Sequence, residues 1–278
     1  MKKISRRSFM AAAAVSVAAL ALTACGGSAS SAASSVASSA ASSEAVSSAA
    51  AAELTTVEAG KLTMATNATF PPYEMTTDSG EIEGIDVDTA KAIAEKLGLE
   101  LQIDDMEFDA ALLSVQQGKA DIVMAGVTVT DERKAVMDFS DSYATGIQSI
   151  IVPEGSDIAS PDDLAGKKIG TQRGTTGYIY CSDDFGEDSV VAYDSGLTAV
   201  QALNNGQVDA VVIDNAPATE YVAANPGLKV LDTSYAEEDY AIGMAKGSSL
   251  EAAVNAALEE LKADGTLQAI VDKYITAE

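Results

Sequence analysis

Three polar segments of the sequence carry the residue types needed to hold a carboxylate and an ammonium group together. Arg133 ends the segment GVTVTDER (residues 126–133), and a guanidinium can grip a carboxylate through two parallel N–H donors. The segment GTTG (residues 174–177) opens an expected helix, whose free N–H groups and positive dipole end also suit a carboxylate. Asp214 ends an apolar run and can meet an ammonium. These residues predict a site for a zwitterion such as a free amino acid.

Composition removes several other classes of function. The 278 residues contain no histidine, which excludes Ser-His-Asp and Cys-His catalysis and histidine-bearing zinc sites. The formal net charge of −25 disfavours binding to a nucleic-acid backbone. Cys181 is expected to be a small packing residue rather than a reactive thiol. Together with the groups for a zwitterion, the absence of histidine leads us to expect a binding protein and not an enzyme, with no catalytic residue, metal or cofactor.

The N-terminal region is expected to direct export and anchoring. Basic residues at positions 2, 3, 6 and 7 precede a short apolar run at 10–22, which is the pattern of a secretory signal, here residues 1–24. The run ends in Leu-Thr-Ala-Cys25 and resembles the bacterial lipoprotein box, which implies lipidation of Cys25. The RRSF sequence leaves Sec and Tat export both open. Residues 25–56 are mostly Ser and Ala and are expected to form a flexible tether, on the extracytoplasmic face of the cell membrane.

The rest of the chain alternates apolar strand patterns with helical ones. This alternation predicts an α/β fold with mainly parallel sheets. The segment QQGKADIVMAG (116–126) is echoed by NNGQVDAVVID (204–214), which suggests two related lobes. In open α/β sheets, ligands bind beyond the carboxyl ends of the strands, and both echoes end at such a point. Among the expected elements are helices at 85–97 and 108–117, strands at 61–66, 208–213 and 240–245, and a turn at 160–164 capped by Ser160.

Motifs spread over residues 60–275 resemble one protein family. They include ATNATFPPYE (65–74), GIDVDTAKAIAEKLG (84–98) and AGVTVTDER followed by DFSD (125–141). The chain resembles the bacterial extracellular solute-binding proteins of family 3, the polar amino-acid-binding components of ABC importers. The resemblance implies the type II periplasmic-binding-protein fold, with two α/β lobes joined by two hinge strands near 143–147 and 239–243. The implied boundaries are 57–145 and 243–278 for lobe 1 and 146–242 for lobe 2.

The resemblance also implies roles for individual residues. Arg133 would clamp the ligand's carboxylate, while the Gly126 carbonyl and Asp214 would meet its ammonium. Thr128 would bond both ends, and Thr175 and Thr176 would add donors from the second lobe. Phe70 and Phe108 would sandwich the ligand side chain, with Glu74 and Arg173 among the residues that tune specificity. The implied ligand-binding set is Asn67, Phe70, Phe108, Gly126, Thr128, Arg133, Gln172, Thr175, Thr176 and Asp214.

The resemblance predicts an extracytoplasmic amino-acid-binding component of an ABC importer. Its partners would be a free amino acid, an ABC transporter permease and, through lipid on Cys25, the membrane; the chain would be a monomer. Family members for basic amino acids usually place an acid where Asn67 stands, so a polar neutral ligand such as glutamine, or cystine, is favoured. Two alternatives stay open: a lipoprotein that presents its ligand to a separate sensor, and an enzyme similar to cyclohexadienyl dehydratase.

Overall fold

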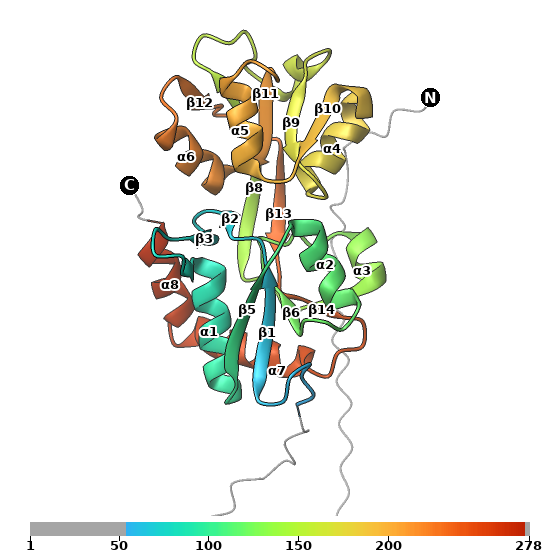
Figure 1. The fold of residues 1–278 in the computed structure, drawn as a ribbon, viewed down its shortest axis with the longest axis vertical. Helices are drawn as coiled ribbons and strands as arrows, with labels where there is room; N and C mark the ends of the chain where they lie inside the picture. Colours follow the sequence, from blue (N-terminus) through green and yellow to red (C-terminus); the bar gives the residue numbers. More distant parts are fainter. Residues whose placement is uncertain (1–53, 276–278) are drawn as a thin grey trace, which may run out of the picture. The chain divides into compact units, whose positions relative to one another are not determined.

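The computed structural model describes residues 54–275 of the chain (Figure 1). The expected signal at 1–24, the lipidated Cys25 and most of the expected tether lie outside these residues. No helix in the described part of the chain is long and apolar enough to cross a bilayer.

The first sheet has five strands in the order β5-β1-β6-β14-β7. Strands β5 and β6 pair with β1 in parallel, with Met64 opposite both Ile103 and Ile122. Strand β14 pairs antiparallel with β6 and β7, so the C-terminal part of the chain returns to this sheet. The strands are β1 (Lys61–Thr66), β5 (Glu100–Asp105), β6 (Ile122–Val123), β7 (Met137–Phe139) and β14 (Gly243–Ala245).

Helices cover this sheet, and α1 shows why they form where the sequence predicts. Its buried side chains include Ile85, Ala90, Ile93 and Ala94, at helical spacing, and Gly98 ends it in the left-handed conformation. The other elements of this lobe are α2 (Phe108–Gln116), α3 (Asp131–Val136), α7 (Glu251–Ala263), α8 (Thr266–Tyr274) and a small sheet of β2 (Thr69–Phe70), β3 (Glu74–Thr76) and β4 (Ile82–Glu83), while α1 spans Ile85–Leu97.

The second sheet has six strands, in the order β10-β9-β11-β8-β12, with β13 also paired to β8. Strands β10, β9 and β11 are parallel, but β8 is antiparallel to each of its neighbours, so this sheet is mixed. The strands are β8 (Ala144–Pro153), β9 (Ile169–Gln172), β10 (Val190–Tyr193), β11 (Ala210–Asp214), β12 (Leu228–Val230) and β13 (Ala236–Tyr240). The helices are α4 (Thr176–Phe185), α5 (Gly196–Asn204), α6 (Asn215–Ala224) and the 3-10 turns η1 (Pro161–Leu164) and η2 (Glu187–Ser189).

Strands β8 and β13 lie side by side where the chain passes between the two sheets, as Figure 1 shows. The single strand expected at 240–245 was wrong: β13 ends at Tyr240 in one sheet and β14 begins at Gly243 in the other. The two residues between them bond elsewhere, Ala241 N to the Val127 carbonyl at 3.1 Å and Ile242 N to Ser140 Oγ at 2.9 Å. The boundaries given above for the two lobes stay a prediction.

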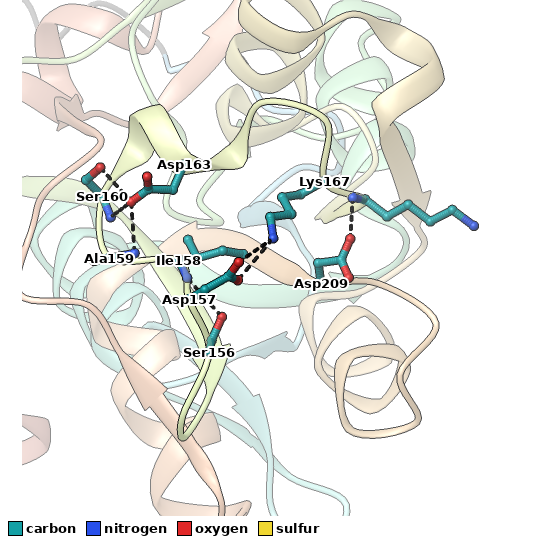
Figure 2. A network of polar contacts seen from close by, with 9 residues as sticks. Ser156, Asp157, Ile158, Ala159, Ser160, Asp163, Lys167 and Asp209 are labelled. Atoms are coloured by element: carbon teal, nitrogen blue, oxygen red, sulfur yellow. Dashed lines mark hydrogen bonds and ion pairs between the residues drawn. The ribbon is translucent and has the colours of Figure 1, made fainter.

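A polar network fixes the connection from β8 to β9 (Figure 2). Ser160 precedes the 3-10 turn η1, as expected, but its hydroxyl donates to Asp163 Oδ2, which also accepts from the Ala159 and Ser160 amides, all at 3.0 Å. Lys167 pairs with Asp157 at 3.0 Å. These local contacts link the turn η1 to the residues on either side of it, just before β9 begins.

Candidate functional site

One pocket of the described structure brings together every residue of the expected ligand-binding set. The space that it encloses, including the part open to solvent, is about 320 Å³. Its lining comes from loops and helix ends of both sheets. Glu74 and Ala125 complete the lining. The roles given to these residues stay predictions, but their convergence from both halves of the described chain makes this pocket the candidate site.

Gly126 lies where β6 runs into the pocket. Its φ of 55° is left-handed, and a Cβ on this residue would lie 2.8 Å from Phe70 Cε1. Its amide donates to Asp86 Oδ2 at 2.9 Å. Glycine is therefore required both for the turn and for the close approach of the Phe70 ring.

Arg133 enters the pocket from α3, whose first turn is capped by Thr130: the Arg133 amide donates to Thr130 Oγ1 at 3.1 Å. The guanidinium is buried and donates to the Thr128 carbonyl at 2.7 Å and, across the pocket, to the Gly174 carbonyl at 3.1 Å. It lies 5.4 Å from the Phe108 ring centroid. None of the ion pairs within residues 54–275 includes Arg133, so a surface pairing with Asp131 or Glu132 does not occupy it.

Thr175 and Thr176 stand at the N-terminus of α4, which begins directly after the turn at Gly174. Thr175 is the cap, and its hydroxyl accepts from the Tyr178 amide at 3.4 Å and donates to the Gln172 carbonyl at 2.8 Å. Thr176 is buried, and its hydroxyl lies 3.4 Å from that of Thr128 on the other side of the pocket. The positive end of a ten-residue helix therefore faces the space beside Arg133.

Asp214 ends β11 and precedes α6, but its side chain makes no capping hydrogen bond to that helix. Its two carboxylate oxygens instead accept from the Tyr240 hydroxyl and from Gln148 Nε2, the latter at 2.8 Å. Burial raises the pKa of Asp214 to about 7, while its hydrogen bond from Tyr240 acts in the opposite direction. A cation placed beside this carboxylate would restore its charged form.

The far end of the pocket is lined by amides, aromatic rings and one acid. Gln172 Nε2 donates to Asn67 Oδ1 at 2.8 Å, and Asn67 Nδ2 donates to the Met106 carbonyl at 2.9 Å. Glu74 is fully buried, and its carboxyl group lies against that of Asp86 with no basic side chain beside them in the pocket's end. Burial, followed by the nearby Asp86 carboxylate, raises the pKa of Glu74 well above its usual range.

Arg173 does not line this pocket. Its side chain is exposed and lies 3.4 Å from Asp194. The specificity role that the resemblance implies for Arg173 therefore has no contact in this structure to support it.

Three buried residues around the pocket were missed by the sequence reasoning: Gln148, Glu238 and Tyr240. Glu238 Oε2 accepts from Thr128 Oγ1 at 3.0 Å, Thr176 Oγ1 at 2.9 Å and Gln148 Nε2 at 3.0 Å. The acidic run at 237–239 resembles a solvated surface. The period-two alternation of a strand, which places Glu238 on the same face as Tyr240, was the signal that could have found it.

A larger hollow of about 1030 Å³ lies beside the same strands but does not fit the expected chemistry. It shares Asp214 with the candidate pocket, and its lining contains no basic side chain. The smaller pocket, which has both Arg133 and Asp214 in its lining, therefore remains the candidate site.

Comparisons with known proteins agree with this architecture. The model of the bacterial extracellular solute-binding proteins, family 3, matches residues 62–277, and the chain belongs to this family. It is 34% identical over 276 residues to a probable histidine-binding protein of Neisseria gonorrhoeae, covering 96% of this chain and 95% of that one. It is also 34% identical to the L-cystine-binding protein TcyJ of Escherichia coli strain K12, with 80% and 85% covered.

Solved structures show the same fold. The arginine-, lysine-, histidine-binding protein ArtJ of Geobacillus stearothermophilus matches with a TM-score of 0.75 and 36% identity, over 78% of this chain and 96% of that one. An ancestral arginine-binding protein bound to glutamine matches with a TM-score of 0.74 and 42% identity, over 78% and 99%. The fold is therefore the type II periplasmic amino-acid-binding fold that the sequence motifs implied.

The charge of Asp214 leads to a test on the ligand-free protein. A carboxyl group whose pKa is raised on folding binds its proton more tightly in the folded state, so the stability it contributes is present below about pH 4 and is lost as the pH rises to about 7. We expect the free energy of unfolding of the parent chain to fall relative to that of Asp214→Asn across this range, by at most about 1.4 kcal/mol per pH unit. Urea unfolding at a series of pH values measures it, with Asp162→Asn on the exposed turn as the matched control. Parallel curves for parent and Asp214→Asn would contradict the assignment.

Proposed function

We propose that this protein captures a free amino acid in the pocket between its two sheets and delivers it to the permease of an ABC importer. The observation that carries the proposal is the convergence of Arg133 and Asp214 on one buried pocket from different halves of the chain. Membership of the family and the amino-acid ligands named for its relatives support it. It acts as a binding protein and not as an enzyme.

The pocket fits the two charged groups of an amino acid separately. The ligand's carboxylate lies against the Arg133 guanidinium and the N-terminus of α4, and it supplies the anion that no described residue places on Arg133. The ammonium lies against Asp214 and the Gly126 carbonyl. Because these groups come from both lobes, the ligand binds the closed arrangement better than an open one and shifts the population toward closure, with β8 and β13 as the hinge strands.

The side-chain end of the pocket fits a polar neutral ligand, such as glutamine or cystine. Asn67 and Gln172 provide amides, and Phe70 and Phe108 provide rings. Two buried carboxyl groups, Glu74 and Asp86, lie close together without a basic partner, and this favours a protonated Glu74. A protonated carboxyl group donates a hydrogen bond to an amide oxygen of the ligand and does not attract a cation.

Two other functions share this fold. A lipoprotein that presents its ligand to a separate sensor would use the same pocket. Only an importer component would also bind a permease, so permease binding distinguishes the two. A dehydratase similar to cyclohexadienyl dehydratase would turn over a prephenate-like acid. The protein is expected to act as a monomer, held through lipid on Cys25 at the extracytoplasmic face of the cell membrane.

A thermal-shift screen of the twenty amino acids and cystine tests the proposed ligand class, because a ligand that binds the folded state raises its melting temperature. We expect at least one neutral polar amino acid to stabilise the parent chain. For that ligand, Arg133→Ala should lose at least about 2 kcal/mol, or about 30-fold, in affinity measured by calorimetry. Arg173→Ala removes an exposed arginine outside the pocket and serves as the control, with an affinity close to that of the parent. A chain that ignores every amino acid would overturn the proposal.

Glu74→Gln separates a neutral ligand from a basic one. The variant keeps the size of the side chain and a hydrogen-bond donor, so glutamine affinity should change by less than about threefold. Binding of arginine would require an ionised Glu74, so its affinity would rise with pH in the parent chain and fall at least about tenfold in the variant. Calorimetry of both ligands with both chains gives the answer, and tight, pH-dependent binding of arginine would rule out the neutral class.

Lipid attachment is tested on the full chain in a bacterial host. We expect the parent protein to take up labelled palmitate and to stay with the membrane fraction. Cys25→Ser should lose both properties, while Cys181→Ser, which changes the buried cysteine of the second lobe, should keep them. Equal labelling of Cys25→Ser and the parent would contradict the anchor.

A further inference from the structure

Glu238 occupies a position that the proposed ligand contacts do not use. It lies on β13, is buried, and does not line the pocket itself. One of its oxygens gathers three donors: the hydroxyls of Thr128 and Thr176, which do line the pocket from opposite sides, and the amide of Gln148. Its other oxygen is buried, and the carboxylate lies near the Tyr180 hydroxyl, whose pKa is raised first by burial and then by a hydrogen bond to Glu238. A carboxylate behind two pocket hydroxyls controls how those hydroxyls point.

A threonine hydroxyl has one proton to donate and two lone pairs that accept. An ionised carboxylate can only accept, so each hydroxyl directs its single proton to Glu238, at 3.0 Å for Thr128 and 2.9 Å for Thr176. Gln148 Nε2 also lies 3.5 Å from Thr176 Oγ1 and takes up at most one of its two lone pairs. Each hydroxyl therefore still offers an acceptor, and not a proton, to the pocket. Gln148 helps to hold both carboxylates in place, because its Nε2 donates a hydrogen bond to Asp214 and another to Glu238.

We infer that Glu238 is a positioning residue that turns the hydroxyls of Thr128 and Thr176 into acceptors and thereby makes this part of the pocket selective for an ammonium group. The inference rests on the proposed function, since it concerns the ammonium of the bound amino acid. It alters one role given above: Thr176 contributes an acceptor through its hydroxyl, and its donor capacity is limited to its backbone amide. The charge of Glu238 also acts on Arg133, where it opposes the lowering of the arginine pKa by burial.

The arrangement also explains how recognition is shared across the pocket. Thr128 follows β6 of the first sheet and Thr176 begins α4 beside the second, yet both bond the same oxygen atom. The two hydroxyls therefore take their acceptor orientation together only when both halves of the pocket are in place. An ammonium group between Asp214 and these two oxygens then meets acceptors on both sides.

Glu238→Gln tests this inference, because the amide keeps the shape of the side chain but brings an N–H₂ donor that reverses the hydroxyls. Calorimetry uses two pairs of probes: L-glutamine with 4-carbamoylbutanoate, and L-arginine with 5-guanidinopentanoate. The ratio of affinities within a pair is a readout that a merely structural role of Glu238 would not change. The second member of each pair lacks only the ammonium. We expect the variant to lose at least about tenfold in affinity for the amino acid that binds the parent chain, and less than about threefold for its partner without the ammonium. Glu237→Gln, on the exposed face of the same strand, is the matched control.

Equal losses for both members of the pair would overturn the inference and leave the proposed function standing, whereas a parent chain that binds none of the twenty amino acids and no cystine would overturn both. Where Glu238→Gln does not fold, as judged by circular dichroism, Thr176→Val replaces it and Glu237→Gln stays the control. Thr176→Val deletes one acceptor with little change in shape, so it should lose affinity for the amino acid selectively. An equal loss in Thr176→Val for the amino acid and for its partner without the ammonium would likewise reject the inference.

Discussion

The rest of the site depends on the cost of keeping the Arg133 guanidinium out of water without a carboxylate beside it. A buried charge is tolerated only when it is paired or hydrogen-bonded. Here the guanidinium donates hydrogen bonds to two backbone carbonyls, those of Thr128 and Gly174. Those carbonyls belong to loops on opposite sides of the pocket. The capped turn of α3 and the glycine turn before α4 therefore both supply a carbonyl to one side chain. Arg133 makes no ion pair with any described residue, and the proposed ligand's carboxylate would supply one.

The buried acidic residues around the pocket differ from one another in their hydrogen-bond partners. Asp214 is held by a hydroxyl and an amide, and Glu238 by two hydroxyls and the same amide. Glu74 has no basic partner in the pocket and lies against Asp86, so burial and like charge both favour its neutral form. The pocket thus separates a polar wall of charged acceptors from a second region whose acid carries its proton. This division matches the two ends of an amino acid: a constant zwitterion and a variable side chain.

Parts of the fold followed from local sequence, and others did not. Helix α1 begins and ends at the predicted residues because its apolar spacing and Gly98 are local signals. Strand 240–245 was predicted wrongly because continuous apolar residues cannot show that the chain changes sheets; that change depends on backbone partners at Val127 and Ser140. In the same way, the acidic run that contains Glu238 resembles surface, and only the packing of β13 against β8 buries it.

The sequence alone determined the residue types of the pocket, the order of the motifs and the alternation of strands and helices, because each is set by neighbours a few positions apart. Only the tertiary structure decided which side chains share a cavity, since Arg133, Thr176 and Asp214 are brought together by two separate sheets. It also decided that Arg173 points to Asp194 while Glu238 lies behind the pocket hydroxyls. Burial and hydrogen-bond direction are properties of contacts between distant segments, and no local pattern encodes them.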